Sequence, residues 1–277
     1  MRPPLRLQIR CLKGIVFAEL AAEKGGLHRL CCVVGLTPRP SQTWSTPDVA
    51  EITTDILDYA TNGSKASGFL ARPQGDGPFP AVIVIQEWWG LNDNIKDIAR
   101  RFAGEGFVAF APDLYHGEVT AEPDEAQKLM MQTDMPRASQ ELVKATEYLS
   151  AQPYVNGRGI GASGFCMGGG LALTLATDTP LIKAAAPFYG VNPQPLEKLQ
   201  NLQGPVLAIY AEHDDFASKT VRETLRSAME QFGKQLEVQV YPGTEHAFFN
   251  DTRREVYREA AADDAWSRVL ALFRAEL

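Results

Sequence analysis

A glycine-rich stretch in the middle of the chain, IGASGFCMGGG at 160–170, surrounds Cys166. An apolar run precedes it and a helical pattern follows, so Cys166 is expected on a sharp strand-to-helix turn. Such a turn forces strained backbone angles, and neighbours without a Cβ, here Gly164 and Gly168, avoid clashes. The helix N-terminus favours thiolate over thiol, which would make Cys166 a nucleophile. The alternative is a structural free cysteine, because cysteine is among the most buried residue types.

Partners for such a nucleophile occur later in the chain. Asp214 and Asp215 follow an apolar run at 205–211, and His246 follows another at 236–241. A histidine can take the thiol proton and later return it to a leaving group, while an aspartate on its other nitrogen fixes the tautomer. Nucleophile, acid and histidine in this chain order are expected of an α/β-hydrolase. His213 is a rival base, but it is too close to the acidic pair in sequence to be oriented by it easily.

Short apolar runs that alternate with amphipathic helices would position these side chains. FPAVIVIQ (79–86) and FVAFAP (107–112) are typical of strands buried on both faces. Between them, NDNIKDIARRFAGEG predicts a helix that Asn92 or Asp93 caps and that ends at Gly104 and Gly106. Further helices are expected at 122–132, 137–151, from Cys166 to about Thr177, at 218–232 and from about 254. Further strands are expected at 158–165, 182–190, 204–215 and 236–242.

This alternation predicts the α/β fold class, with a mainly parallel sheet covered by helices on both faces. Neither a repeat nor an internal linker is evident, so residues 51–277 are interpreted as one domain. Ligands of such sheets bind outside the carboxyl ends of the strands. The side chains that follow the predicted strands are therefore expected to converge there.

Composition excludes several function classes. The net charge of −7 and the pI near 5.2 argue against a nucleic-acid partner, which needs a basic surface. Long uninterrupted apolar runs are absent from the sequence, so we expect no membrane-spanning helix. Four cysteines are too few for a disulfide framework and favour reduced thiols in the cytoplasm. The spacing of the His and Cys residues indicates neither a metal site nor another cofactor.

Residues 1–50 differ from the rest of the chain. Within residues 1–47, seven Lys and Arg stand against two Glu, and three of the four cysteines (Cys11, Cys31 and Cys32) lie there. Basic segments poor in acidic residues resemble transit peptides, although this one contains little serine. We therefore interpret residues 1–50 as a poorly ordered extension, or as sequence upstream of the true start, and leave a targeting or docking role open.

Four separated blocks resemble the dienelactone hydrolase family, α/β-hydrolases with a Cys-His-Asp triad. The blocks are VIVIQEWWGLNDNIKDIARRFAGEGFVAFAPDLYHG (82–117), GFCMGGGLAL (164–173), EHDDFAS (212–218) and GTEHAFFND (243–251). The resemblance extends over residues 52–277. Carried over position by position, it implies Cys166 as the nucleophile, Asp214 as the acid and His246 as the base.

Glu87, in QEWWG, matches the active-site glutamate of that family. A carboxylate near a thiol disfavours the thiolate, so Glu87 could keep Cys166 protonated at rest, and the resemblance implies that substrate binding frees the thiol. The alternative is that Glu87 only pairs with a neighbouring base or loop amide. The oxyanion hole is expected from the backbone N–H groups of Trp88 and Met167. Trp88 and Trp89 could also form a pocket wall, or only cover the edge of the core.

The chain departs from the family where the substrate carboxylate binds. The family has an arginine four residues after the catalytic histidine, but this chain has Asn250 there. A second arginine is expected in 121–131, which contains only Lys128. Arg253 and Arg254 lie nearby and could substitute, but a bidentate clamp does not follow from them. Tyr115 and His116, after another strand, are further pocket candidates, as is Asn250.

These residues together predict a hydrolase of small ester or lactone substrates that acts through a thioester acyl-enzyme, needs no cofactor or metal, and is a monomer or a homodimer. Two other functions remain open. One is a non-catalytic α/β-hydrolase relative that binds a small ligand or a protein, which separation of Asp214 from His246 would favour. The other is a redox sensor that uses Cys166, although residues near Cys166 in sequence include no second cysteine.

Overall fold

A computed structural model describes residues 7–12, 15–20, 51–61 and 65–277, and the chain divides into two units, Met1–Pro47 and Asp48–Leu277. In the first unit, strands β1 (Leu7–Leu12) and β2 (Ile15–Leu20) pair in antiparallel orientation. Neither strand was expected from the sequence, in which residues 1–50 were interpreted as poorly ordered. The remainder of the proposed extension lies outside the described residues.

The second unit contains one eight-stranded sheet with the order β10-β9-β8-β7-β5-β6-β4-β3. Its six strands from β10 to β6 are parallel, whereas β4 and β3 are antiparallel additions at one edge. The strands are β3 (Ile52–Ala60), β4 (Lys65–Pro73), β5 (Phe79–Ile85), β6 (Val108–Pro112), β7 (Val155–Phe165), β8 (Ile182–Phe188), β9 (Val206–His213) and β10 (Leu236–Glu245). The predicted parallel sheet is confirmed.

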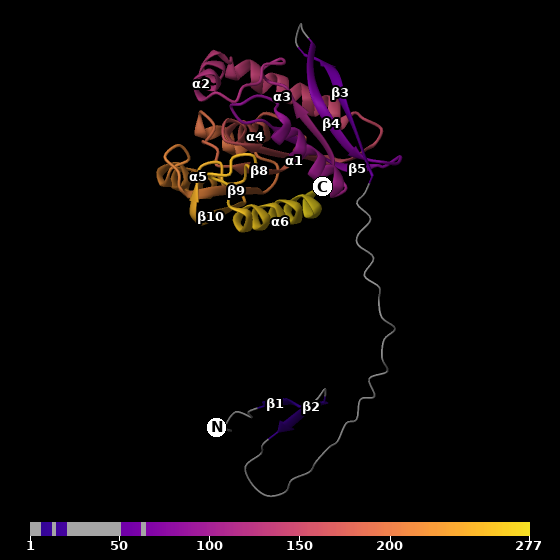
Figure 1. Cartoon of the computed structure of the whole chain (residues 1–277), viewed down its shortest axis with the longest axis vertical. Coiled ribbons are helices and arrows are strands. Elements are labelled where there is room, and N and C mark those ends of the chain that lie inside the picture. Colours follow the sequence, from indigo (N-terminus) through magenta and orange to yellow (C-terminus); the bar gives the residue numbers. More distant parts are fainter. Residues whose placement is uncertain (1–6, 13–14, 21–50, 62–64) are drawn as a thin grey trace, which may run out of the picture. The chain divides into compact units, whose positions relative to one another are not determined.

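Helices connect the parallel strands and cover the sheet, as Figure 1 shows. They are α1 (Asp93–Gly104), α2 (Pro123–Gln132), α3 (Met135–Ser150), α4 (Met167–Asp178), α5 (Lys219–Gln231) and α6 (Glu259–Glu276), with the 3₁₀ helix η1 at Leu196–Asn201. On one face, α1 and α6 pack together through Phe102 and Trp266, whose ring centroids lie 4.4 Å apart. On the other face, α3 packs on α4, which contacts β7 and β8.

The local reasons for these elements agree with the sequence patterns. The Asn92 side chain caps α1 by accepting a hydrogen bond from the Ile95 N–H at 3.2 Å. The side chains of Ile95, Ile98 and Phe102 recur at helical spacing and are buried. In β5, Val82 to Ile85 have no exposed surface, as a central strand covered on both faces requires.

Two details differ from the expectations. The C-terminal helix begins at Glu259 rather than near residue 254, because residues 251–257 form turns that bring Arg253 and Val256 to the site described below. The pair β3–β4 was missed altogether. β3 is an edge strand whose side chains are mostly exposed, so its sequence lacks the regular alternation that marks a half-buried strand.

Candidate active site

Cys166 lies on the turn between β7 and α4, as predicted. Its φ of +55° and ψ of −115° place a non-glycine residue in a sparsely populated region, which costs about 1–3 kcal/mol. The turn is possible because its neighbours are glycines. A Cβ on Gly164 would lie 2.1 Å from the Gly168 carbonyl oxygen, and one on Gly168 would lie 2.4 Å from the Gln86 carbonyl oxygen. The sequence thus holds the thiol at a strained turn directly above the sheet.

His246 and Asp214 come together from the ends of β10 and β9. The His246 Nδ1 and Asp214 Oδ2 atoms are 2.7 Å apart, and the Asp214 side chain has no exposed surface. The other oxygen of Asp214 accepts hydrogen bonds from the backbone N–H groups of Phe216 and Ala217. These bonds fix the carboxylate so that one oxygen orients the imidazole. A non-catalytic relative with separated Asp214 and His246 does not fit this geometry.

The electrostatics of the pair favour an imidazolium. Burial lowers the pKa of His246, but the hydrogen bond to Asp214 and the nearby Cys166 sulfur have a larger effect in the opposite direction. The net result is that the pKa of His246 is raised to about 10. Burial raises the pKa of Asp214, yet the His246 hydrogen bond and the two backbone N–H groups hold it below its usual value. The His246 Nε2 atom is buried and has no hydrogen-bond partner among the described residues. It is therefore free to exchange a proton with a bound reactant.

The rival residues are placed differently. Asp215 is exposed and has no hydrogen bond within the described part of the chain. The His213 side chain is 66% exposed, and its Nε2 lies 3.6 Å from Glu212. Of the two aspartates left open by the sequence, Asp214 is the one that contacts His246.

Glu87 lies at the same site and is almost fully buried. Its Oε2 accepts a hydrogen bond from the Asn250 side-chain amide at 3.0 Å, and its Oε1 lies 3.5 Å from the Tyr189 hydroxyl, which donates to it. Burial raises the pKa of Glu87, whereas the bond from Asn250 opposes that effect. Asn250 is thus a positioning residue behind Glu87. The expectation that Asn250 lines the substrate pocket was wrong, because Asn250 is not among the residues of the cavity wall.

The two residues whose backbone N–H groups are expected to form the oxyanion hole, Met167 and Trp88, line the same cavity as Cys166. Met167 is the first residue of α4, where an N–H has no partner within the helix, and Trp88 follows Glu87 in the loop after β5. Among the described residues, neither N–H donates a hydrogen bond to another protein group. Both are available to an oxyanion.

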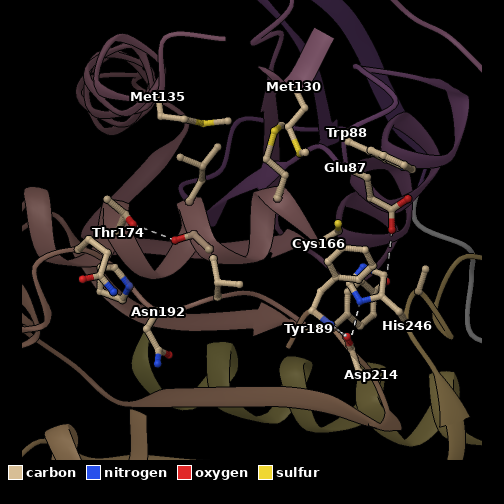
Figure 2. Close-up of a pocket in the computed structure, with 18 of the residues that line it drawn as sticks. Glu87, Trp88, Met130, Met135, Cys166, Thr174, Tyr189, Asn192, Asp214 and His246 are labelled. Carbon is tan, nitrogen blue, oxygen red and sulfur yellow. Dashed lines mark hydrogen bonds and ion pairs between the residues drawn. The ribbon is translucent and has the colours of Figure 1, made fainter. Parts of the chain in front are cut away.

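A cavity of about 1580 Å³ joins these groups, and its walls include Cys166, Glu87, Trp88, Trp89, Asp214 and His246. Figure 2 shows Glu87, Cys166, His246 and Asp214 gathered at one end of it. Both tryptophans line it, as one of the two sequence readings proposed. Tyr115 does not line this cavity. Its hydroxyl lies 3.5 Å from the Met167 sulfur, so it supports the wall from behind.

The remaining candidates for a carboxylate clamp are not arranged as one. Arg253 lines the cavity, but its Nε binds Glu255 at 2.9 Å. Lys128 pairs with Glu125 on the surface. Neither Arg254 nor His116 lines the cavity, and His116 lies 3.5 Å from Glu141.

Tyr189 is the site residue that the sequence analysis missed. It directly follows β8, is 1% exposed, and its ring centroid lies 4.9 Å from that of His246. Burial raises its pKa well above the usual value, and the charges of Glu87 and Cys166 add to this effect. The criterion that found His246, a polar side chain just past a strand end, could also have found Tyr189.

The described residues contain no cluster of three or more His, Cys, Asp or Glu side chains suited to a metal ion. Within those same parts of the chain, every helix is too short or too polar to cross a membrane.

The chain has relatives that are similar over most of its length. The family model of the dienelactone hydrolase family matches residues 66–277. A protein of Saccharolobus solfataricus with the provisional name carboxymethylenebutenolidase is 39% identical in an alignment of 252 residues that covers 78% of this chain and 96% of that protein. An Escherichia coli K12 protein with the same provisional name is 32% identical in an alignment of 260 residues that covers 86% of this chain and 92% of its own.

Solved structures agree with these sequence matches. A crystal structure from Klebsiella pneumoniae, provisionally named a dienelactone hydrolase, is 30% identical with a TM-score of 0.75, and the match covers 81% of this chain and 99% of that one. The family model extends from β4 to the end of α6 and includes the turn that carries Cys166. The chain therefore belongs to the dienelactone hydrolase family and is a hydrolase with the α/β-hydrolase fold.

Proposed function

We propose that the protein hydrolyses carboxylic ester or lactone bonds of small molecules, with Cys166 as the nucleophile. The observation that carries this proposal is the 2.7 Å contact between His246 and Asp214, with the free His246 Nε2 on the same cavity as the strained Cys166 turn. The carboxymethylenebutenolidase names of the relatives support the same bond type.

In the first half-reaction His246 takes the proton of the Cys166 thiol, the sulfur attacks the carbonyl carbon, and a C–S bond forms. The carbonyl oxygen becomes an oxyanion that accepts hydrogen bonds from the Met167 and Trp88 amides, donors typically worth about 3–4 kcal/mol each. The C–O bond to the leaving group then breaks, and the His246 imidazolium supplies the proton that the alkoxide needs. The product of this step is a thioester with the enzyme.

In the second half-reaction water replaces the alcohol. The contribution of Cys166 to the raised pKa of His246 ends when the sulfur is acylated, so the imidazole becomes a better base for water. Water attacks the thioester, His246 takes its proton, and the C–S bond breaks to release the carboxylic acid. Proton return to the sulfur regenerates the resting enzyme.

The test of the proposal is a panel of aryl esters, alkyl esters and lactones assayed for acid release. We expect turnover of some neutral esters and formation of a thioester of matching mass on the peptide that contains Cys166. If folded enzyme hydrolysed none of these esters and lactones during a prolonged incubation, the proposal would be refuted.

The raised pKa of His246 predicts a pH limit. His246 must be protonated to donate to the leaving group, so kcat/KM for alkyl esters should fall as the pH rises through about 10. The Asp214→Asn variant should show this fall at lower pH, because the Asp214 hydrogen bond raises the pKa of His246. The measurement is kcat/KM from neutral pH to about pH 11. A p-nitrophenyl ester is the control, since its leaving group needs little protonation, and identical profiles for both esters would contradict the assignment.

Glu87 is proposed to make the resting Cys166 less reactive, because its carboxylate repels negative charge that develops on the sulfur. Both groups line one cavity, and the charges of both raise the pKa of the same phenol, that of Tyr189. Glu87→Gln should therefore speed the alkylation of Cys166 by iodoacetamide, measured by peptide mass mapping. Glu245→Gln, which removes an exposed charge at the cavity rim, should leave the rate unchanged. If Cys166 were alkylated in Glu87→Gln no faster than in the wild type, Glu87 would not be the residue that makes the resting thiol less reactive.

A further inference from the structure

The cavity is larger than a small lactone requires. Pockets that enclose drug-sized ligands measure roughly 300–1,000 Å³, whereas this one measures about 1580 Å³. The excess lies along α4, away from the thiol. In Figure 2, Met135 and Thr174 lie on one side of the pocket, and Cys166 and His246 lie on the other.

One face of α4 forms a wall of this extension. Met167, Gly170, Leu171, Thr174 and Asp178 all line the cavity, and their spacing of three, four, seven and eleven residues places them on one side of the helix. At a rise of 1.5 Å per residue, this face extends about 10 Å from Met167 to Thr174 and about 16 Å to Asp178. The extension therefore has one wall that is about 16 Å long.

Apolar side chains from two other helices face the extension. Met130 comes from the end of α2, and Met135 and Val143 come from α3. Methionine side chains adapt to flexible apolar ligands because they are unbranched and polarizable. We refer to the space lined by Met130, Met135, Val143, Met167, Leu171 and Thr174 as the α4 channel.

Polar groups that bind one another lie at the far end of the α4 channel. The Ser139 hydroxyl donates to one oxygen of Asp178 at 2.7 Å, and the Lys198 ammonium binds the other at 2.7 Å. These bonds tie α3, α4 and η1 together beside the channel. These groups set the maximum length of an apolar ligand in the channel, because a longer ligand would have to separate the ion pair between Lys198 and Asp178.

The charges around the whole cavity disfavour an anionic ligand. Six Asp and Glu side chains line it against four Lys and Arg. Each of those four cations already has a partner: Lys198 binds Asp178, Lys219 binds Glu223, Arg253 binds Glu255, and Arg222 donates to the Ala211 carbonyl oxygen. A substrate carboxylate would find no free cation among the described residues of the wall.

The position of His246 decides which part of an ester enters the channel. His246 must reach the leaving-group oxygen, so the alcohol lies on the His246 side of Cys166. The acyl group then points the other way, along α4. The exposed Phe216, whose ring centroid lies 5.4 Å from that of His246, borders the alcohol side.

We propose that the α4 channel binds a linear apolar acyl group, and that neutral medium-chain esters are substrates of this enzyme. This proposal rests on the proposed function and adds the substrate class to it. Each methylene that leaves water for the channel favours binding, so selectivity should rise with chain length until the chain reaches Asp178.

The test compares p-nitrophenyl octanoate with p-nitrophenyl acetate. We expect kcat/KM for octanoate to exceed that for acetate by about 10³-fold, because six further methylenes are buried. The p-nitrophenyl monoester of suberic acid, which has the same length but a terminal carboxylate, should lose most of this advantage, because the carboxylate would enter an apolar channel whose wall offers it no free cation. Equal kcat/KM for octanoate and acetate, or a preference for the suberate, would overturn the proposal.

Variants locate the effect in the channel. Thr174→Phe from α4 and Met135→Phe from α3 each place a bulkier, rigid ring in the channel from one wall. Each should lower the octanoate-to-acetate ratio at least about tenfold, because overpacking a filled apolar space is unfavourable. Gln127→Phe, at an exposed position of α2 outside the cavity, should leave the ratio unchanged. Unchanged ratios in both channel variants would place the acyl group elsewhere.

A binding measurement separates this proposal from the proposed function. Octanamide is neutral and resists hydrolysis, and by calorimetry it should bind the wild-type protein far more tightly than acetamide does. Thr174→Phe should weaken octanamide binding at least tenfold, a loss of about 1.4 kcal/mol. If no ester were hydrolysed but octanamide bound in this way, the proposed function would fail and the channel would stand. Absence of octanamide binding would refute the channel even if short esters were hydrolysed.

Discussion

Cys166→Ala is expected to lower kcat for ester hydrolysis by a factor of about 10⁴ or more. The acyl-enzyme cannot form without the sulfur, and a water molecule in its place lacks both its nucleophilicity and its fixed position on the turn. The Met167 and Trp88 amides and the cavity would remain, so a small residual rate over solution is expected. The measurement is kcat for an activated ester together with the mass of acid-quenched enzyme, in which the wild type should carry the acyl group and the variant should not.

The control for this variant keeps Cys166 and removes the other thiols. Cys11, Cys31 and Cys32 all lie in the first 47 residues, ahead of the segment that matches the family. Their combined replacement by alanine should leave kcat and acyl-enzyme formation unchanged. Wild-type activity in Cys166→Ala, or acylation of another residue, would disprove the nucleophile assignment.

Asp214→Asn is expected to lower kcat by about 10³ to 10⁴. The amide can donate to the Nδ1 atom of His246, which would place the proton on Nε2 and leave that atom unable to act as a base. The variant also loses the charge that stabilises the imidazolium. Because the Phe216 and Ala217 N–H groups can still bind the amide oxygen, the turn should keep its conformation.

Asp215→Asn provides a matched control with the same change of charge one residue away. Asp215 is exposed, and the described residues offer it no hydrogen bond, so kcat should change less than twofold by the usual behaviour of surface substitutions, within about ±0.5 kcal/mol. Thermal unfolding of both variants would show whether the fold is intact. A larger loss in Asp215→Asn than in Asp214→Asn would reverse the assignment of the acid.

Much of the fold and the site could be predicted from the sequence. Buried parallel strands have continuous apolar runs, and the runs at 79–86 and 107–112 correspond to β5 and β6. Parallel strands bring their carboxyl ends to one edge of the sheet, so the residues that follow them converge. This rule located Cys166, His246 and the aspartate pair before their distances were known.

The edge strand β3 could not be predicted from apolar runs in the sequence. Side chains of β3 are exposed at most positions, so burial imposes little pattern on its sequence. Its pairing with β4 depends on backbone hydrogen bonds, which any residue except proline can donate. A strand held in this way leaves a weak sequence signal.

The direction of individual side chains was decided by contacts between distant segments. Asp214 and Asp215 are indistinguishable by type and position, and the turn at Phe216 and Ala217 turns the first toward His246 and the second toward solvent. Asn250 follows His246 closely enough to be expected in the pocket, yet its amide binds Glu87 from behind, 163 residues away in the chain. Local patterns specify which residues form strands, turns and helices, because those patterns depend on near neighbours. The orientation of a loop side chain depends on contacts with residues that are distant in the sequence. Those contacts are known only once the tertiary structure is known.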